Sequence, residues 1–115
     1  MFSSLQEFIY WIVVAVPSIL IASTVHEYAH AYSAYKLGDP TAKAEGRLTL
    51  NPLKHIDPIG ALSMILFRFG WSKPVPINEY NFEKRETYTA LTALAGPVSN
   101  LILASLAGLT NYILN

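Results

Sequence analysis

Residues 24–32 read TVHEYAHAY and stand at the end of a long apolar run. Residues 8–25 contain no charged side chain over 18 positions, and about 20 apolar residues are enough to cross a bilayer as a helix. Residues 87–115 form a second uncharged stretch of 29 positions. Together the two stretches predict an all-α membrane protein. The alternative, a soluble domain with two apolar core helices, is less favoured because so small a domain buries that much apolar surface poorly.

The composition agrees with this prediction. The 115 residues are 52% hydrophobic and 14% charged, whereas soluble domains carry about 25% charged residues. This length suits one domain, so residues 1–115 are predicted to form a single membrane-embedded domain. The net charge is zero, and the absence of a basic block gives no indication of a nucleic-acid partner. Cysteine is absent, so any metal must be bound through nitrogen and oxygen atoms.

Two long helices are predicted from the uncharged stretches. The first is expected from about residue 3 to residue 37, and the Gly-Asp-Pro sequence at 38–40 ends it. Pro17 lies inside this helix and is expected to kink it. The second helix is expected over 87–115, with a break or kink at 96–97, where Gly is followed by Pro.

The connecting segment has a different character. The alternating sequence RLTL at 47–50 predicts a short strand. Residues 58–71 are apolar but few and are interrupted by Arg68, so a partial or re-entrant membrane segment is predicted. Residues 71–78, WSKPVPIN, are expected to be extended because of their prolines. The predicted architecture is therefore two to three transmembrane helices with a short β-strand and loop insertion between them.

All eight Lys and Arg side chains lie between the two long stretches. Positively charged loops usually stay in the cytoplasm. The sequence therefore predicts a multi-pass protein of the cell membrane with loop 36–86 on the cytoplasmic side. This orientation requires that residues 58–71 do not cross the membrane completely.

Three ionisable residues carry the chemistry of the opening stretch. His26 and His30 are four positions apart, so a helix places them on one face, and imidazole nitrogens bind zinc at about 2 Å. Glu27, beside the first histidine, is placed to take the proton of a metal-bound water. This HExxH pattern is typical of zinc hydrolases. The alternative is that the three side chains cap and solvate a helix end, which is less favoured because ionisable residues at the end of a span are usually functional.

A catalytic zinc site usually has a third protein ligand. His55 and Asp57 are two positions apart, so in extended chain their side chains point to the same side. One of them could bind zinc, or Asp57 could orient a ligand histidine. Alternatively, Asp57 is a turn residue before Pro58. Asp39, in the Gly-Asp-Pro sequence, is interpreted as a turn former.

Four motifs in one order resemble a known family, the site-2 proteases, which are intramembrane zinc metalloproteases. The small prokaryotic branch of that family is the most similar, and the resemblance covers nearly the whole chain from about residue 20. The motifs are HEYAH at 26–30, GDPTAKAEGRLTLNPLKHIDPIG at 38–60, FGWSKPVPIN at 69–78 and ALAGPVSN at 93–100.

The resemblance implies a zinc ion bound by His26 and His30, with Glu27 as the general base in peptide hydrolysis within the membrane. It also implies that residues 47–50 and 73–77 lie near the active site, where they could hold a substrate peptide as an added strand. Asn100 is then expected to face the active-site cavity and contact substrate. Equally, it could join two helices as a polar contact, beside small residues of its own helix.

One departure from the family pattern affects the predicted function. The third zinc ligand of the family is usually an aspartate in a Leu-Asp-Gly motif on a later span, and this sequence contains no such motif. The chain is therefore interpreted as the N-terminal part of a longer family fold. The predicted function is a zinc endopeptidase whose partners are the lipid bilayer and a membrane-associated protein substrate. The alternative is a catalytically inactive fragment or membrane scaffold of the same fold, and no oligomeric state is predicted.

Overall fold

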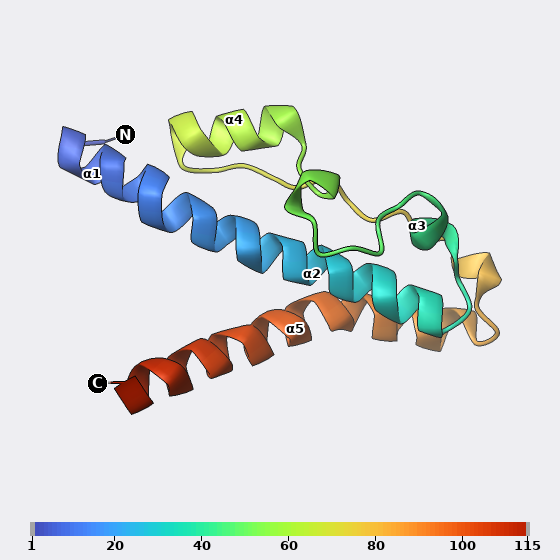
Figure 1. Cartoon of the computed structure of the whole chain (residues 1–115). Helices are drawn as coiled ribbons and strands as arrows, with labels where there is room; N and C mark the ends of the chain where they lie inside the picture. Colours follow the sequence, from blue (N-terminus) through green and yellow to red (C-terminus); the bar gives the residue numbers. More distant parts are fainter. Residues whose placement is uncertain (1, 115) are drawn as a thin grey trace.

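The computed structural model describes residues 2–114, which consist of helices and loops (Figure 1). In chain order the elements are α1 (Leu5–Tyr10), the π-helical turn η1 (Trp11–Ala15), α2 (Val16–Lys36), α3 (Thr41–Ala44), the 3-10 turn η2 (Pro52–Lys54), α4 (Pro58–Phe67), the 3-10 turn η3 (Glu79–Asn81) and α5 (Arg85–Leu114). α1, η1 and α2 form one continuous helix of 32 residues. This helix and α5 are both long and apolar enough, by length and composition, to cross a membrane, which confirms the predicted all-α membrane class.

The first long helix accommodates Pro17 by a local change of winding. Proline has no N–H to donate to the carbonyl four residues earlier. The turn directly before it is π-helical, and the N–H of Val16 donates to the carbonyl of Trp11, five residues back. The helix ends as predicted, because Leu37 is its C-cap and Gly38 adopts a φ of +115°.

The second long helix is continuous through residues 96–97, where a break or kink is predicted, so no break forms there. Pro97 lies inside α5, and Figure 1 shows the helix bending along its length. A long apolar helix can tolerate an internal proline where neighbouring groups satisfy the freed backbone. The hydroxyl of Ser99 donates to the carbonyl of Gly96 at 2.7 Å, close to the bend.

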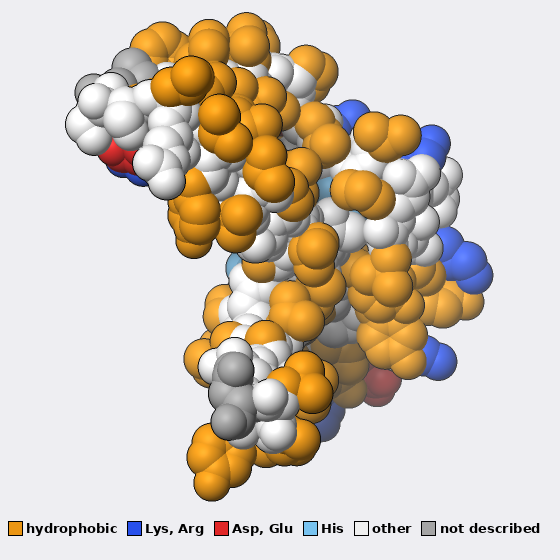
Figure 2. Space-filling model, turned by 60° about the vertical axis from the view of Figure 1, so that its left-hand side comes forward, with side chains coloured by type: hydrophobic (Ala, Val, Ile, Leu, Met, Phe, Trp, Pro, Cys, Tyr) orange, Lys and Arg blue, Asp and Glu red, His pale blue; other side chains and the backbone are white. Residues whose placement is uncertain are grey.

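The two long helices lie side by side over part of their length and then diverge towards the two chain ends (Figure 1). We call the packed part, residues 24–39 with 78–100, the closed end, and the diverging parts, residues 5–15 and 101–114, the open end. Hydrophobic side chains cover both diverging arms, and a hollow separates them (Figure 2). Most of the Lys and Arg side chains visible in that view gather at the opposite side of the molecule.

Asp39 fastens the closed end. Its side chain is fully buried and accepts hydrogen bonds from the backbone N–H of Asn78 at 2.8 Å and from the side-chain amide of Asn81 at 2.9 Å. It also accepts from the N–H and the hydroxyl of Thr41. The predicted turn former therefore also ties the end of α2 to the segment that leads into α5.

The predicted strand at residues 47–50 is not formed. Between residues 2 and 114 the structure has only an isolated antiparallel bridge, which joins Ile56 and Ser72. The alternating pattern was misleading because the side chain of Arg47 turns inward to bind the carbonyls of Lys73 and Pro74. The strand prediction is therefore wrong, and this part of the insertion is an irregular loop.

Residues 58–72 form what we call the α4 hairpin. α4 has ten residues, which at 1.5 Å per residue is about 15 Å, or half of a bilayer core. Arg68 ends it in the left-handed conformation, with φ of 65°, and the chain then turns back beside α4 (Figure 1). The return is close, because a Cβ on Gly60 would collide with the carbonyl of Trp71. The hairpin fits the predicted partial segment, and α4 is too short to cross the membrane.

Candidate metal centre

His26 and His30 lie on α2 one turn apart, and their rings meet edge to face. Their Nε2 atoms are 3.0 Å apart. Two nitrogens bound to one tetrahedral zinc, each at 2.0–2.1 Å, would be roughly 3.3 Å apart. The spacing is therefore close to the one that a shared metal ion requires.

Both rings are held from α5. The Nδ1 atom of His30 is 2.7 Å from the carbonyl oxygen of Thr92. A carbonyl only accepts, so this Nδ1 carries the proton and the Nε2 atom keeps its lone pair. The Nδ1 atom of His26 is 3.1 Å from the amide nitrogen of Asn100, which donates to it. The proton of His26 is then on Nε2, where it is donated to His30.

The hydrogen bonding of the Asn100 amide bears on whether the two histidines can bind a metal ion. Its Oδ1 atom is buried and has no hydrogen-bond partner among the described residues. Rotating the amide by half a turn exchanges its oxygen and nitrogen. Oδ1 would then accept from an Nδ1–H of His26, and both Nε2 lone pairs would be free. Ligand histidines usually donate their other nitrogen in this way, so the residues present fit two imidazole ligands of a zinc ion.

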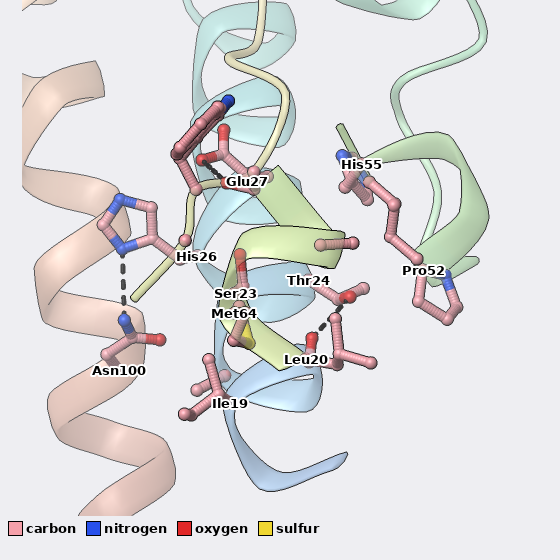
Figure 3. A pocket seen from close by; sticks show the side chains of 16 residues that line it. Ile19, Leu20, Ser23, Thr24, His26, Glu27, Pro52, His55, Met64 and Asn100 are labelled. Atoms are coloured by element: carbon pink, nitrogen blue, oxygen red, sulfur yellow. Dashed lines mark hydrogen bonds between the residues drawn. The ribbon is translucent and has the colours of Figure 1, made fainter. Parts of the chain in front are cut away.

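Glu27 lies beside this pair at the wall of a cavity of about 490 Å³. Its Oε1 atom accepts a hydrogen bond from the hydroxyl of Ser72 at 3.1 Å. Ser72 lies in the segment of the α4 hairpin that turns back beside α4. Figure 3 shows His26 and Asn100 facing each other from α2 and α5, with Glu27 further along α2. His55 lines the same cavity from the insertion. Two histidines, a carboxylate and an amide thus line one cavity whose wall is otherwise mostly apolar.

The wall that carries Ser72 is held in place by buried Arg47, which lies in the segment where a strand is predicted. Arg47 donates to the carbonyls of Lys73 at 2.6 Å and Pro74 at 3.0 Å. It also donates to the Nδ1 atom of His55 at 3.3 Å, while the other nitrogen of His55 donates to the carbonyl of Thr49. Both nitrogens of His55 are therefore engaged, which leaves it no lone pair for a metal. A lone Arg in an apolar segment needs such carbonyl partners.

Asp57 is the N-cap of α4. Its carboxylate accepts from the N–H groups of Ile59 at 2.9 Å and Gly60 at 3.1 Å, and the bond from Gly60 is the main reason that its pKa lies below the ordinary value. Within residues 2–114, no three His, Cys, Asp or Glu side chains are placed to share a metal. The structure therefore does not bring Asp57 to the histidines, and its position matches the alternative interpretation of a turn residue before Pro58.

Known proteins similar to this chain are named as zinc metalloproteases. "Putative zinc metalloprotease YwhC" of Bacillus subtilis is 47% identical over 104 residues, which cover 87% of this chain. "Putative zinc metalloprotease Rip2" is 36% identical over 98 residues in Mycolicibacterium smegmatis and 30% identical over 98 residues in Mycobacterium tuberculosis. These matches cover 79% and 82% of this chain. The chain belongs to the site-2 protease family.

The chain matches only part of the length of each relative. The chain spans about half of its Bacillus relative, 48%, and 37% and 38% of the two Rip2 proteins. No family model matches the sequence, and no solved structure matches it. The similarity therefore rests on sequence alone and on a part of each relative.

Proposed function

We propose that this chain supplies the histidine and glutamate part of an intramembrane zinc endopeptidase. One observation carries the proposal: the Nε2 atoms of His26 and His30 are 3.0 Å apart, and α5 binds the opposite nitrogen of each ring. Glu27 follows the first histidine at the wall of the same cavity. The names of the relatives as zinc metalloproteases add support.

The residues divide the work of hydrolysis between them. When bound, zinc supplies a Lewis acid that acidifies a water and polarises a peptide carbonyl. His26 and His30 hold the ion, and their rings are oriented by Asn100 and the carbonyl of Thr92. Glu27 takes the proton of the water and gives it to the leaving amine.

Glu27 needs a fixed direction for this transfer. Its Oε1 atom accepts from Ser72 at 3.1 Å, and Ser72 is paired with Ile56 in the isolated bridge. One carboxylate oxygen is thus held by the hairpin, and the other stays available for the proton. A general base must lie within hydrogen-bond reach of its proton, so this contact is a positioning contact.

Within residues 2–114, no group of three suitable side chains is present. The third protein ligand is therefore proposed to come from outside these residues. The chain is then the N-terminal part of a longer catalytic fold, in keeping with relatives about twice its length. The other candidate function is a catalytically inactive fragment or membrane scaffold. The scaffold would be favoured if zinc were bound by the two histidines alone, without a third protein ligand.

The substrate is proposed to be a membrane-associated or transmembrane protein segment that becomes extended in the cavity. A helical substrate must unwind first, because its carbonyls are otherwise engaged within the helix. Residues 73–77 form neither helix nor strand, and Pro74, Val75 and Ile77 line a pocket together with Glu27 and His30. This segment is proposed to offer an edge for such a peptide. Asn100, on the cavity wall, is proposed to face the same peptide. In this arrangement the closed end, with loop 36–86, is on the cytoplasmic side, where water reaches the site.

Glu27→Gln tests the proposal. The assay uses the longer protein that contains these residues together with the third ligand. It follows cleavage of a quenched fluorescent single-span peptide in liposomes, with zinc content measured on the same samples. Cleavage is expected to fall by about 10²–10⁴-fold, while zinc content stays near the wild-type value because Glu27 is not a ligand. Equal cleavage by wild type and variant would contradict the proposal. A zinc-loaded wild-type chain without any cleavage would favour the scaffold.

A further inference from the structure

Gly96 occupies a special place in α5. It is buried, and a Cβ built on it would lie 2.5 Å from the Nε2 atom of His30. The same Cβ would lie 2.7 Å from both Nε2 and Cε1 of His26. Real Cβ atoms essentially never approach other atoms within 3.0 Å, so no side chain fits here while the two rings keep their positions.

The missing side chain would meet both rings at the nitrogens that are proposed to bind the ion. An ion shared by His26 and His30 must lie about 2.0–2.1 Å from each Nε2 atom, whereas the Cβ position lies 2.5 and 2.7 Å from these atoms and is as close to Cε1 of His26 as to its Nε2. A Cβ here would therefore push the two rings out of place. We propose that Gly96 is the residue that allows the two imidazoles to take the positions in which they share a metal ion. This inference rests on the proposed function, because it takes the two histidines as the ligands.

The inference predicts that a substitution at Gly96 weakens metal binding without unfolding the helix. The three atoms nearest to the missing Cβ all belong to the two imidazole rings, and none of them is a backbone atom. Rings can rotate away, but His30 would then lose its bond to Thr92 and His26 its bond to Asn100. A helix interior favours Ala over Gly by about 1 kcal/mol. Gly96→Ala is therefore expected to keep the helix and lose the ligand geometry.

The same helix provides a matched control. Gly108 also lies in α5, and a Cβ added there would have nothing within 4 Å. Gly108→Ala makes the same chemical change with the same gain in helix propensity. The two substitutions differ in what the new methyl group meets.

The test is a titration of the purified, metal-free chain in detergent with Zn²⁺ and with Co²⁺, whose visible absorption reports coordination. Wild type, His26→Ala, Gly96→Ala and Gly108→Ala are compared, and circular dichroism and melting temperature check each fold. We expect Gly96→Ala to weaken metal binding by about tenfold or more, the range seen when supporting groups of a metal site are lost. Gly108→Ala should bind as wild type does, and both should keep wild-type helicity.

A second cycle tests whether the obstacle is the contact with the ring. His30→Cys replaces the imidazole by a shorter ligand that does not reach the Cβ position. Gly96→Ala should cost more metal affinity when residue 30 is His than when it is Cys, because only the contact with His26 then remains, and the difference is a coupling between the two sites. A general disturbance of helix packing would lower affinity equally in both backgrounds.

The outcomes separate the two proposals. Binding that is equal in wild type and His26→Ala overturns the proposed function and the inference with it. No binding by wild type overturns the inference that the pair of histidines beside Gly96 holds a metal in this chain. Binding that needs His26 but is unchanged in Gly96→Ala overturns the inference alone. The inference also fails if Gly96→Ala does not fold, or if Gly108→Ala loses metal to the same extent.

Discussion

The closed and open ends belong to the same two long helices, yet only the closed end carries the histidine pair. At the closed end the facing residues are small or polar: Ala31 and Ala34 are fully buried, and Thr92 is nearly so. At the open end the side chains of α5 are large and exposed, such as Leu101 and Tyr112. Small residues let helices approach closely in a membrane. Apolar length therefore marks the spans, and small residues mark where they meet around the histidines.

The largest expected difference between the ends comes from removing an aromatic ring. Phe82 at the closed end is 5% exposed, and its ring meets that of Tyr88 edge to face at 6.2 Å. Phe82→Ala should lower the free energy of unfolding by about 3–5 kcal/mol. Tyr112→Ala at the open end, where Tyr112 is 81% exposed, should leave it nearly unchanged. Denaturation in one detergent compares the two, and equal losses would remove the distinction between the ends.

A smaller effect is expected from the carboxylate that fastens the closed end. Burial by itself would raise the pKa of Asp39, but hydrogen bonds from Thr41, Asn81 and Asn78 outweigh it and hold the pKa below its ordinary value of 3.8. A carboxylate with a lowered pKa stabilises the fold above the ordinary value, and this stabilisation is lost as the pH falls through the folded value. Asp39→Asn should therefore lower the free energy of unfolding at pH 7 by about 1.5–3 kcal/mol, and the melting temperature should fall with it.

The pH dependence checks the same contact in the opposite direction. Between pH 7 and pH 3 the wild type should lose more stability than Asp39→Asn, because the variant has no charge left to lose. Melting curves of both proteins across this range give the comparison. Parallel losses would show that the acid sensitivity arises elsewhere.

The smallest effect is expected at Asp57. Asp57→Ala removes the N-cap of α4 and should cost about 1 kcal/mol, with zinc content unchanged. Asp57→Asn, which keeps a capping oxygen, should recover most of that stability. Loss of zinc in both variants would restore Asp57 as a ligand, as the sequence had suggested.

The sequence predicted what depends on nearby residues. The two spans, the Gly-Asp-Pro stop and the common face of His26 and His30 all follow from local periodicity and composition. One error arose where a distant partner decides the outcome. Residues 47–50 alternate like a strand, but Arg47 needed buried carbonyls that residues 73 and 74 supply. At residues 96–97, where a break or kink was predicted, α5 does not break and bends along its length.

Two of the groups that support the site were beyond such reasoning. The contact of His30 with Thr92 joins residues 62 positions apart, and the contact of Glu27 with Ser72 joins residues 45 apart. Neither partner belongs to a recognisable ligand pattern. Gly96 stood in a quoted motif, but the glycine was interpreted as part of a helix break. Only the structure shows that its missing side chain faces the two imidazoles.

The most direct test of the account is zinc K-edge X-ray absorption on the zinc-loaded chain, for wild type and His30→Ala. The account predicts two imidazole nitrogens at about 2.0–2.1 Å from zinc in wild type, and a reduction of the imidazole scattering to a single ring in the variant. A spectrum without imidazole scattering, or one that His30→Ala leaves unchanged, would contradict the claim that the closed end holds the metal between these two histidines.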